Sequence, residues 1–215
     1  MRLFFVLAVF PGLLCAQSDE LLTKIWNGVQ QAQAKITSGC GKITETRTSK
    51  LLVKPLVFHG TFCAEGLDRF ALEYSEPDPI RIRFNGDYLN VTTGGGKNTE
   101  VIEVGANVRR TQAYFSRENS IENLKKNFIM DAREGDAREG DARKAGGVFI
   151  LKLVPRSGRF GAALNYIVVQ LRREDFLLRS LEVDGKNGVN SVFLIDVTSV
   201  NSKIPPGMFE VYRPK

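Results

Sequence analysis

Apolar residues recur at two different spacings along the chain, and the change of spacing marks a change of structure. In residues 19–36 they fall mainly three or four positions apart, which predicts a helix with one apolar stripe. The stripe consists of Leu22, Ile25, Trp26, Val29, Ala32 and Ile36. Ser18 or Asp19 is suited to the N-cap of this helix, and Ser38-Gly39 to its end.

From residue 40 to residue 104 the apolar positions alternate with polar ones, which is typical of half-buried strands. Phe70, Leu72 and Tyr74, for example, alternate with Arg69, Ala71 and Glu73. A short helix is expected at residues 119–126, and strands then resume up to a last short one at 209–212. About ten antiparallel strands with two helices predict an α+β fold, with the helices set against one large sheet.

Residues 40–49 and 53–64 predict a hairpin that turns near Leu51 and Leu52. In that register Cys40 lies directly opposite Cys63, where cross-strand cysteines meet the Cα spacing of about 5.5 Å that a disulfide needs. We therefore predict a Cys40–Cys63 disulfide. Two separate buried thiols are the alternative.

The N-terminus has the pattern of a secretory signal peptide: Arg2, an apolar run over residues 3–14, and Ala16 before a polar stretch. The run is too short to span a bilayer of about 30 Å. We expect residues 1–16 to be removed after Ala16, which leaves residues 17–215 as a single exported domain. Lipidation of Cys15 is disfavoured, because Leu14 stands where lipoprotein signals need a small residue.

Residues 131–147 repeat the unit Asp-Ala-Arg-Glu-Gly and end in a variant of it. The glycines and the mixed charges favour a solvated loop at a hairpin tip. A tandem insertion tolerated at the surface is the favoured interpretation, and a charged docking tip is the alternative.

The amino-acid composition limits the functions that the protein could have. The chain has one histidine, His59, and its net charge of +6 is too evenly spread to indicate nucleic acid. Phe supplies 14 aromatic residues, against 5 Tyr and 1 Trp. His59 is expected to face solvent, and Gly94-Gly95-Gly96 lies between strands rather than before a helix, which excludes a phosphate-binding loop. We expect no enzyme activity, no cofactor and no metal site.

Three stretches carry a resemblance to a known family. They are Gly60-Thr61-Phe62 leading to residues 69–77; Asn85-Gly86-Asp87-Tyr88-Leu89; and a C-terminal series made of residues 151–155, 181–185, Asn201, Ile204-Pro205, 209–211 and Pro214. In order and spacing they resemble the LolA family of periplasmic outer-membrane lipoprotein carriers. Gly66-Leu67 occupies the place of an arginine that this family uses in lipoprotein transfer, and the nearest arginine is Arg69.

The resemblance implies an incomplete, unclosed antiparallel β-barrel, with an N-terminal helix and a short internal helix covering a hydrophobic cavity. It also implies a monomer in the periplasm. The implied partners are an acylated lipoprotein or lipid as cargo, an inner-membrane lipoprotein-release transporter and an outer-membrane receptor. The apolar stripe of residues 22–36 would supply the cover.

We expect the inner strand positions to line a cavity for acyl chains. These are Phe58, Phe62, Phe70, Leu72, Tyr74, Ile82, Phe84, Leu151, Leu153 and Tyr166. Arg69 is assigned to the cavity rim, where it, Arg81 and Arg83 could meet anionic head groups. The favoured interpretation of these three arginines is that they are ordinary solvated strand residues. The sequence thus predicts a carrier that shuttles lipoproteins or another lipid without chemistry of its own. The alternative is an interaction protein on the same fold that senses a lipid or lipoprotein.

Overall fold

The computed structural model describes residues 12–66, 68–104, 121–136 and 147–212. The helices are α1 (Gly12–Lys35), α3 (Ile121–Asn127), α4 (Gly158–Ala163) and the 3-10 turn η1 (Gly94–Gly96). The first strands are β1 (Ser38–Ser49), β2 (Leu56–Glu65), β3 (Arg69–Glu76), β4 (Ile80–Phe84), β5 (Tyr88–Thr93) and β6 (Asn98–Glu103). The others are β7 (Phe128–Asp136), β8 (Gly147–Pro155), β9 (Leu164–Arg172), β10 (Leu178–Gly185) and β11 (Val189–Val200).

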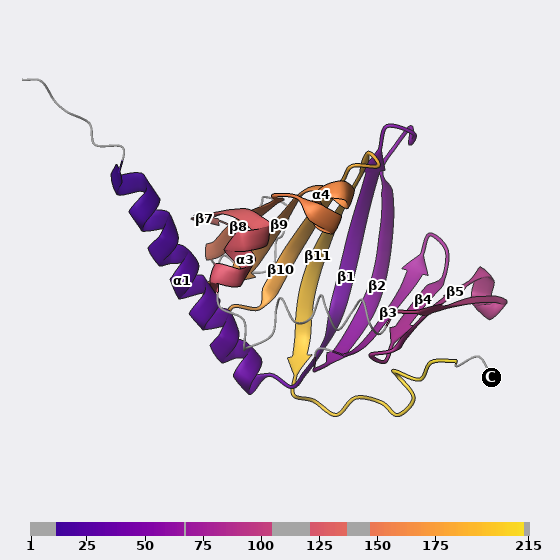
Figure 1. Ribbon diagram of the computed structural model, residues 1–215. Helices are drawn as coiled ribbons and strands as arrows, with labels where there is room; N and C mark the ends of the chain where they lie inside the picture. The colour runs from indigo at the N-terminus through magenta and orange to yellow at the C-terminus, as the bar shows by residue number, and fades with distance from the viewer. Residues whose placement is uncertain (1–11, 67, 105–120, 137–146, 213–215) are drawn as a thin grey trace, which may run out of the picture.

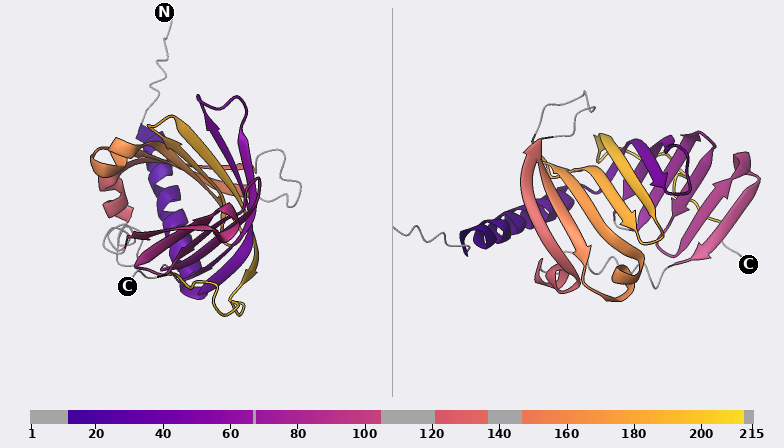
Figure 2. Two further views of the ribbon diagram at one scale, coloured as in Figure 1. Left: turned by 90° about the vertical axis from the view of Figure 1, so that its right-hand side faces the viewer. Right: turned by 90° about the horizontal axis from the view of Figure 1, so that it is seen from above.

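All the strands among the described residues belong to one 11-stranded sheet in the order β6-β5-β4-β3-β2-β1-β11-β10-β9-β8-β7. The neighbouring strands pair antiparallel, and the long pairing of β1 with β11 joins the two ends of the chain. The sheet is strongly curved, with α1 running across its hollow side (Figures 1 and 2). Because β6 and β7 form its two edges, the barrel remains open, which confirms the predicted fold class.

The first hairpin has the predicted register. Cys40 pairs with Cys63, and Arg47 pairs with Leu56 at the other end of the two strands. A disulfide joins Cys40 to Cys63, with an S–S distance of 2.10 Å and a Cα–Cα distance of 4.1 Å. The link lies on the outer face, since the alternating residues Ile43 and Phe58 belong to an apolar cluster of the inner face.

Two apolar clusters share the concave face. In the first, Leu22 and Ile25 of α1 pack with the strand residues Ala132, Phe149 and Leu171. The apolar stripe of the helix therefore faces the sheet, as predicted. The second cluster has at its centre Ile43, Phe58, Leu72 and Tyr74 of β1, β2 and β3.

The position of α1 leaves the second cluster beside the helix rather than under it. Strands lie about 4.8 Å apart, whereas a helix with its side chains is only about 10–12 Å across. One helix therefore covers two or three strands of a sheet this wide. The strand nearest to α1 is β7, at one edge of the sheet, and the α1 side chains also reach Phe149 of β8 and Leu171 of β9.

Several local predictions need correction. β7 continues through residues 131–136, which pair with β8, so the first repeat unit is strand rather than loop; residues 137–146 lie outside the described residues. The predicted strand at 209–212 is instead irregular structure, held by the backbone of Tyr212, which exchanges hydrogen bonds with the Asn90 side chain. Helix α4 was not predicted, because Gly158 and Gly161 disfavour helix in so short a segment.

The segment after β11 is tied to the end of α1. The Asn201 side chain accepts a hydrogen bond from the backbone N–H of Thr37 at 2.8 Å and donates one to the carbonyl of Lys35 at 2.8 Å. The bond to Lys35 satisfies one of the carbonyls that a helix leaves open at its C-terminus, and the bond from Thr37 holds the residues that follow the helix. The chain therefore turns from helix into strand at a fixed point.

Candidate functional site

A large apolar cavity lies on the concave face, beside the cluster that α1 covers. Its volume is about 1250 Å³, which exceeds the range of roughly 300–1,000 Å³ typical of small-molecule pockets. Strands β1–β5, β10 and β11 supply most of its walls, and Ala163 and Leu164 close one side. Its lining is mainly aliphatic and aromatic, as a site for hydrocarbon chains requires.

The structure brings together part of the expected cavity residues. Those that line the cavity are Phe58, Phe62, Phe70, Leu72, Tyr74 and Ile82. The remaining ones, Phe84, Leu151, Leu153 and Tyr166, lie outside its lining. Each is placed elsewhere for a separate reason.

Phe84 is on the same strand face as Ile82, but it is the last residue of β4 and lies beyond the end of the cavity. Leu151 packs against the cluster beneath α1. Leu153 is buried on the same face of β8, where it is 8% exposed.

Tyr166 lies on the opposite face of the sheet. It pairs with Asp184, whereas the neighbouring residue Val183 lines the cavity. Its hydroxyl hydrogen-bonds Glu182 at 3.0 Å, and Lys152 lies over its ring. The sequence did not indicate which face of β9 turns inward, because apolar residues occupy both odd and even positions of this strand.

Arg69, which was assigned to the rim, and Arg81 and Arg83 all point away from the cavity, as solvated strand residues do. Arg69 forms an ion pair with Glu65 at 2.8 Å and lines a polar depression under the C-terminal segment. Arg81 lies 2.7 Å from Glu73 and Arg83 lies 3.6 Å from the same carboxylate. Strand alternation places these charges on the convex face, opposite Phe70 and Ile82.

The cavity wall holds a polar cluster that sequence reasoning missed. Glu45 is only 2% exposed, and both of its carboxylate oxygens accept hydrogen bonds from neighbouring side chains. Oε1 accepts hydrogen bonds from Nε and Nη2 of Arg47 at 3.0 and 2.8 Å and from Oγ of Ser191 at 3.0 Å. Oε2 accepts one from the hydroxyl of Tyr74 at 2.7 Å. A buried carboxylate of this kind is tolerated because its oxygens are fully paired.

The surroundings of this cluster fix the protonation of the phenol. Burial, and next the hydrogen bond to Glu45, raise the pKa of Tyr74 well above its ordinary value of 10.0. Tyr74 is therefore a hydrogen-bond donor at neutral pH. The guanidinium of Arg47 lies over the Phe58 ring, 5.0 Å from its centroid, where a cation–π contact helps to position it.

A sequence signal for this cluster did exist. Ile43, Glu45 and Arg47 alternate with Thr44 and Thr46, so the two charges share a strand face with an apolar residue. Charges on the apolar face of a strand indicate a paired or functional group. Ser191 was out of reach, since it lies 146 residues from Glu45 in the sequence.

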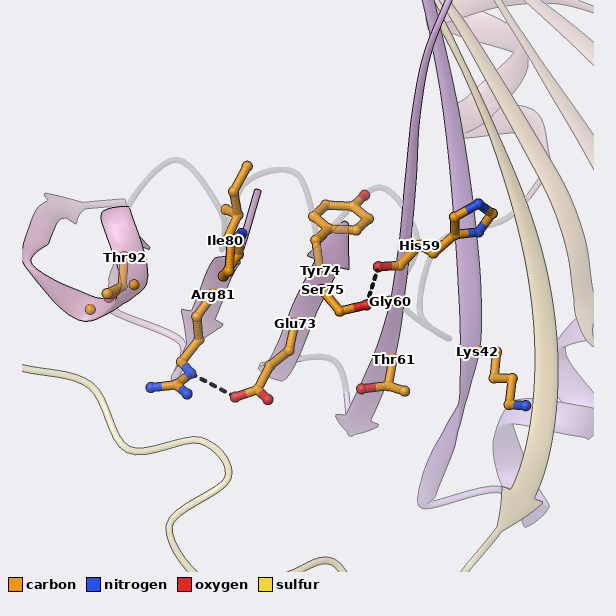
Figure 3. Close-up of a pocket in the computed structure, with 13 residues that line it drawn as sticks. Lys42, His59, Gly60, Thr61, Glu73, Tyr74, Ser75, Ile80, Arg81 and Thr92 are labelled. Carbon is orange, nitrogen blue, oxygen red and sulfur yellow. Dashed lines mark hydrogen bonds and ion pairs between the residues drawn. The ribbon is translucent and has the colours of Figure 1, made fainter. Parts of the chain in front are cut away.

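A smaller, polar depression of about 560 Å³ lies on the convex face (Figure 3). In Figure 3, Tyr74 and Ile80 point to the opposite side from Glu73 and Arg81, as alternation requires. His59 lines this depression and is exposed, as expected. The Nδ1 atom of His59 lies 3.2 Å from the hydroxyl of Thr44. The Ser75 hydroxyl bonds the His59 backbone carbonyl rather than its imidazole, so this pair lacks the contact that activates a serine.

Two features are absent from the described residues. No group of three or more His, Cys, Asp or Glu side chains in that part of the chain is placed to hold a metal ion. Among the same residues, no helix is both long and apolar enough to cross a membrane.

No protein-family model matches this sequence, and no curated protein matches it either. Solved structures do. A conserved protein from Thermus thermophilus is 8% identical, with 88% of this chain and 93% of that chain covered and a TM-score of 0.53. A chain of the Pseudomonas aeruginosa MucA/MucB complex is 10% identical, with 89% of this chain and 61% of that chain covered and a TM-score of 0.50.

A LolA superfamily protein from Nitrosomonas europaea is also among the similar structures, at 10% identity and a TM-score of 0.42, with 89% of this chain and 98% of that chain covered. Identities this low show a shared fold alone. The fold of this chain, an open antiparallel barrel with a helix against its concave face, is the one that the resemblance noted in the sequence implied.

Proposed function

We propose that this protein is an exported lipid-binding protein that carries the acyl chains of lipoproteins, or of another lipid, through the periplasm. The observation that carries the proposal is the apolar cavity of about 1250 Å³ beside α1. The signal-peptide pattern of residues 1–16 supports export of residues 17–215 as one domain.

The walls suit reversible binding. Transferring an acyl chain from water is worth about 0.8 kcal/mol per buried CH₂. A carrier has to give up most of that free energy when it unloads. Walls formed largely by Phe, Leu, Ile and Val bind hydrocarbon without directional contacts, so the chain can leave as it entered. This role requires no catalysis and no cofactor, and delivery would involve a releasing transporter at one membrane and a receptor at the other.

The test is native mass spectrometry of protein purified from the exported fraction. Wild-type protein is expected to carry acylated ligand, and Phe70→Glu, which places a charge on the cavity wall, is expected to lose it. Val57→Glu is the matched control, because Val57 is 41% exposed on the convex side of β2. Wild-type protein that is folded and free of ligand after incubation with lipid vesicles would overturn the proposal.

A lipid-sensing interaction protein is the second candidate. The specific observation is the similarity in fold to a chain from the MucA/MucB complex, a structure of two proteins bound together. Transfer to acceptor vesicles separates the two candidates. A carrier passes radiolabelled acyl cargo to the vesicles, whereas a sensor keeps its ligand and changes its affinity for a protein partner.

A further inference from the structure

The cavity is polar at one end and apolar at the other. Arg47 pairs with Ser191 at the end near the first hairpin, and Asn187 lines the cavity at the same end. Ala64 and Val197 line the opposite end. From Ser191 to Val197 the β11 wall extends for about 20 Å at about 3.3 Å per residue. Such a lining matches an amphiphile whose head lies at Arg47.

Among the described residues that line the cavity, Glu45 and Arg47 are the charged ones. Glu45 has both oxygens occupied and is almost completely buried, so it offers nothing to a ligand. The Arg47 side chain is 42% exposed. Arg47 is therefore the group of this pair that a ligand can reach.

The guanidinium of Arg47 has donors left over. Of its five N–H groups, one on Nε and one on Nη2 point to Glu45. The described part of the chain provides no acceptor for the other three. Two of these three N–H groups, one on Nη1 and one on Nη2, lie side by side at the end of the guanidinium. This Nη1–Nη2 edge has the geometry to bind a carboxylate or phosphate through two parallel hydrogen bonds.

Glu45 and Phe58 hold that edge in place. The two bonds to Glu45 fix the plane of the guanidinium, and the Phe58 ring lies 5.0 Å below it. A positioned donor loses less side-chain entropy on binding than a mobile one. The apolar walls beside it also strengthen an ionic contact relative to open water.

We propose that Arg47 binds the anionic head, carboxylate or phosphate, of a single amphiphile whose hydrocarbon chain occupies the cavity. The inference rests on the proposed function, because it needs the cavity to hold hydrocarbon. Arg47 is thus the site for an anionic group. Arg69, Arg81 and Arg83 are not, because they face the other side of the sheet. Arg47 also gives the carrier a preferred ligand class: anionic lipids over neutral or cationic ones of the same chain length.

The test uses four ligands with one chain length: dodecanoate, dodecyl phosphate, dodecanol and dodecylammonium, each displacing the neutral dye Nile red. Wild-type protein is expected to bind at least one of the two anions about ten- to a hundredfold more tightly than dodecanol, as suits charge-assisted hydrogen bonds. The stronger of the two anions identifies the source as a carboxylate or a phosphate. Dodecylammonium is expected to bind most weakly.

Arg47→Gln should reduce the affinity for the preferred anion to that for dodecanol while leaving dodecanol binding unchanged. Arg81→Gln is the control, since it removes an arginine from the convex face. Because Arg47→Gln leaves Glu45 without its cation, two further variants guard against misfolding. Glu45→Gln/Arg47→Gln removes both charges and should also lose the preference, and Arg47→Lys should keep part of it.

Equal affinity of wild-type protein for dodecanol and both anions would overturn this inference and leave the proposed function standing. So would an equal loss for all four ligands in Arg47→Gln and in the double variant. Failure of all four ligands to displace the dye from folded wild-type protein would overturn the proposed function and this inference together.

Discussion

Tyr74 donates a hydrogen bond of 2.7 Å from its hydroxyl to Oε2 of Glu45, inside the wall of an apolar cavity. The bond links β3 to β1 across the intervening strand β2. It also completes the set of partners that keeps a carboxylate stable in a site almost closed to solvent. The properties of this pair lead to the first two predictions.

The first prediction concerns pH. The pKa of Tyr74 is raised in the folded protein, so the unfolded chain loses this proton first as the pH rises above about 10. Stability from this group is complete below pH 10 and is lost as the pH rises towards the folded-state pKa. Urea unfolding should therefore show that the free energy of unfolding is lower above pH 10 than at neutral pH. This decrease should be smaller in Tyr74→Phe than in the wild type.

Tyr212→Phe is the matched control for that measurement, because the Tyr212 side chain is 65% exposed. It should keep the wild-type pH profile. At neutral pH, Tyr74→Phe should lose about 1.5–3 kcal/mol, the range for a hydrogen bond to a charged group. An identical alkaline decrease in wild type and Tyr74→Phe would contradict the assignment.

The second prediction concerns the Glu45–Arg47 ion pair. Arg47→Leu leaves a buried carboxylate without its cation, and we expect a loss of about 3 kcal/mol in the free energy of unfolding. Glu45→Leu/Arg47→Leu removes both charges and should recover most of that loss. A double-mutant cycle in urea, completed with Glu45→Leu, measures the coupling, and additive losses would show that the two side chains act independently.

The third prediction concerns Gly28 on α1, which receives the ring of Phe176. A Cβ at Gly28 would overlap that ring, and the ring itself stacks on Phe149 at a centroid distance of 5.5 Å. Gly28→Ala should therefore destabilise the protein, although alanine is favoured in helices by about 1 kcal/mol.

The same substitution should change sign once the ring is removed. In a Phe176→Ala background, Gly28→Ala has room for its methyl group and should stabilise the protein by up to about 1 kcal/mol. Thermal unfolding of the four proteins checks this. Destabilisation in both backgrounds would mean that the contact with Phe176 is not what selects glycine.

The fourth prediction concerns the Cys40–Cys63 link, which closes a loop with a sequence separation of 23. Without reductant, alkylation should leave the mass of the folded protein unchanged at both positions. Cys40→Ala/Cys63→Ala should lose about 2–4 kcal/mol, mainly because the unfolded chain gains freedom. Adding reductant should lower the stability of wild type and leave the variant unaffected. Alkylation of both cysteines without reductant would instead show two free thiols.

The sequence alone determined the local structure and one long hairpin. Apolar spacing predicted α1, because the positions that must be buried on a helix recur every three or four residues. Alternation predicted the strands, and the short connection between β1 and β2 set a register that matches the structure from Cys40 to Arg47. These features depend on contacts between residues close together in the chain.

Only the tertiary structure decided which strand faces meet and what covers them. Period-two alternation shows that a strand has two faces, but it does not say which one turns inward. For this reason alternation did not predict that Tyr166 lies on the convex face. It also did not predict that Leu151 packs with the α1 cluster. The burial of Glu45 depends on β1 lying beside β11, a pairing between opposite ends of the chain. Sequence pattern cannot specify such a pairing, because it is selected by the packing of the whole sheet.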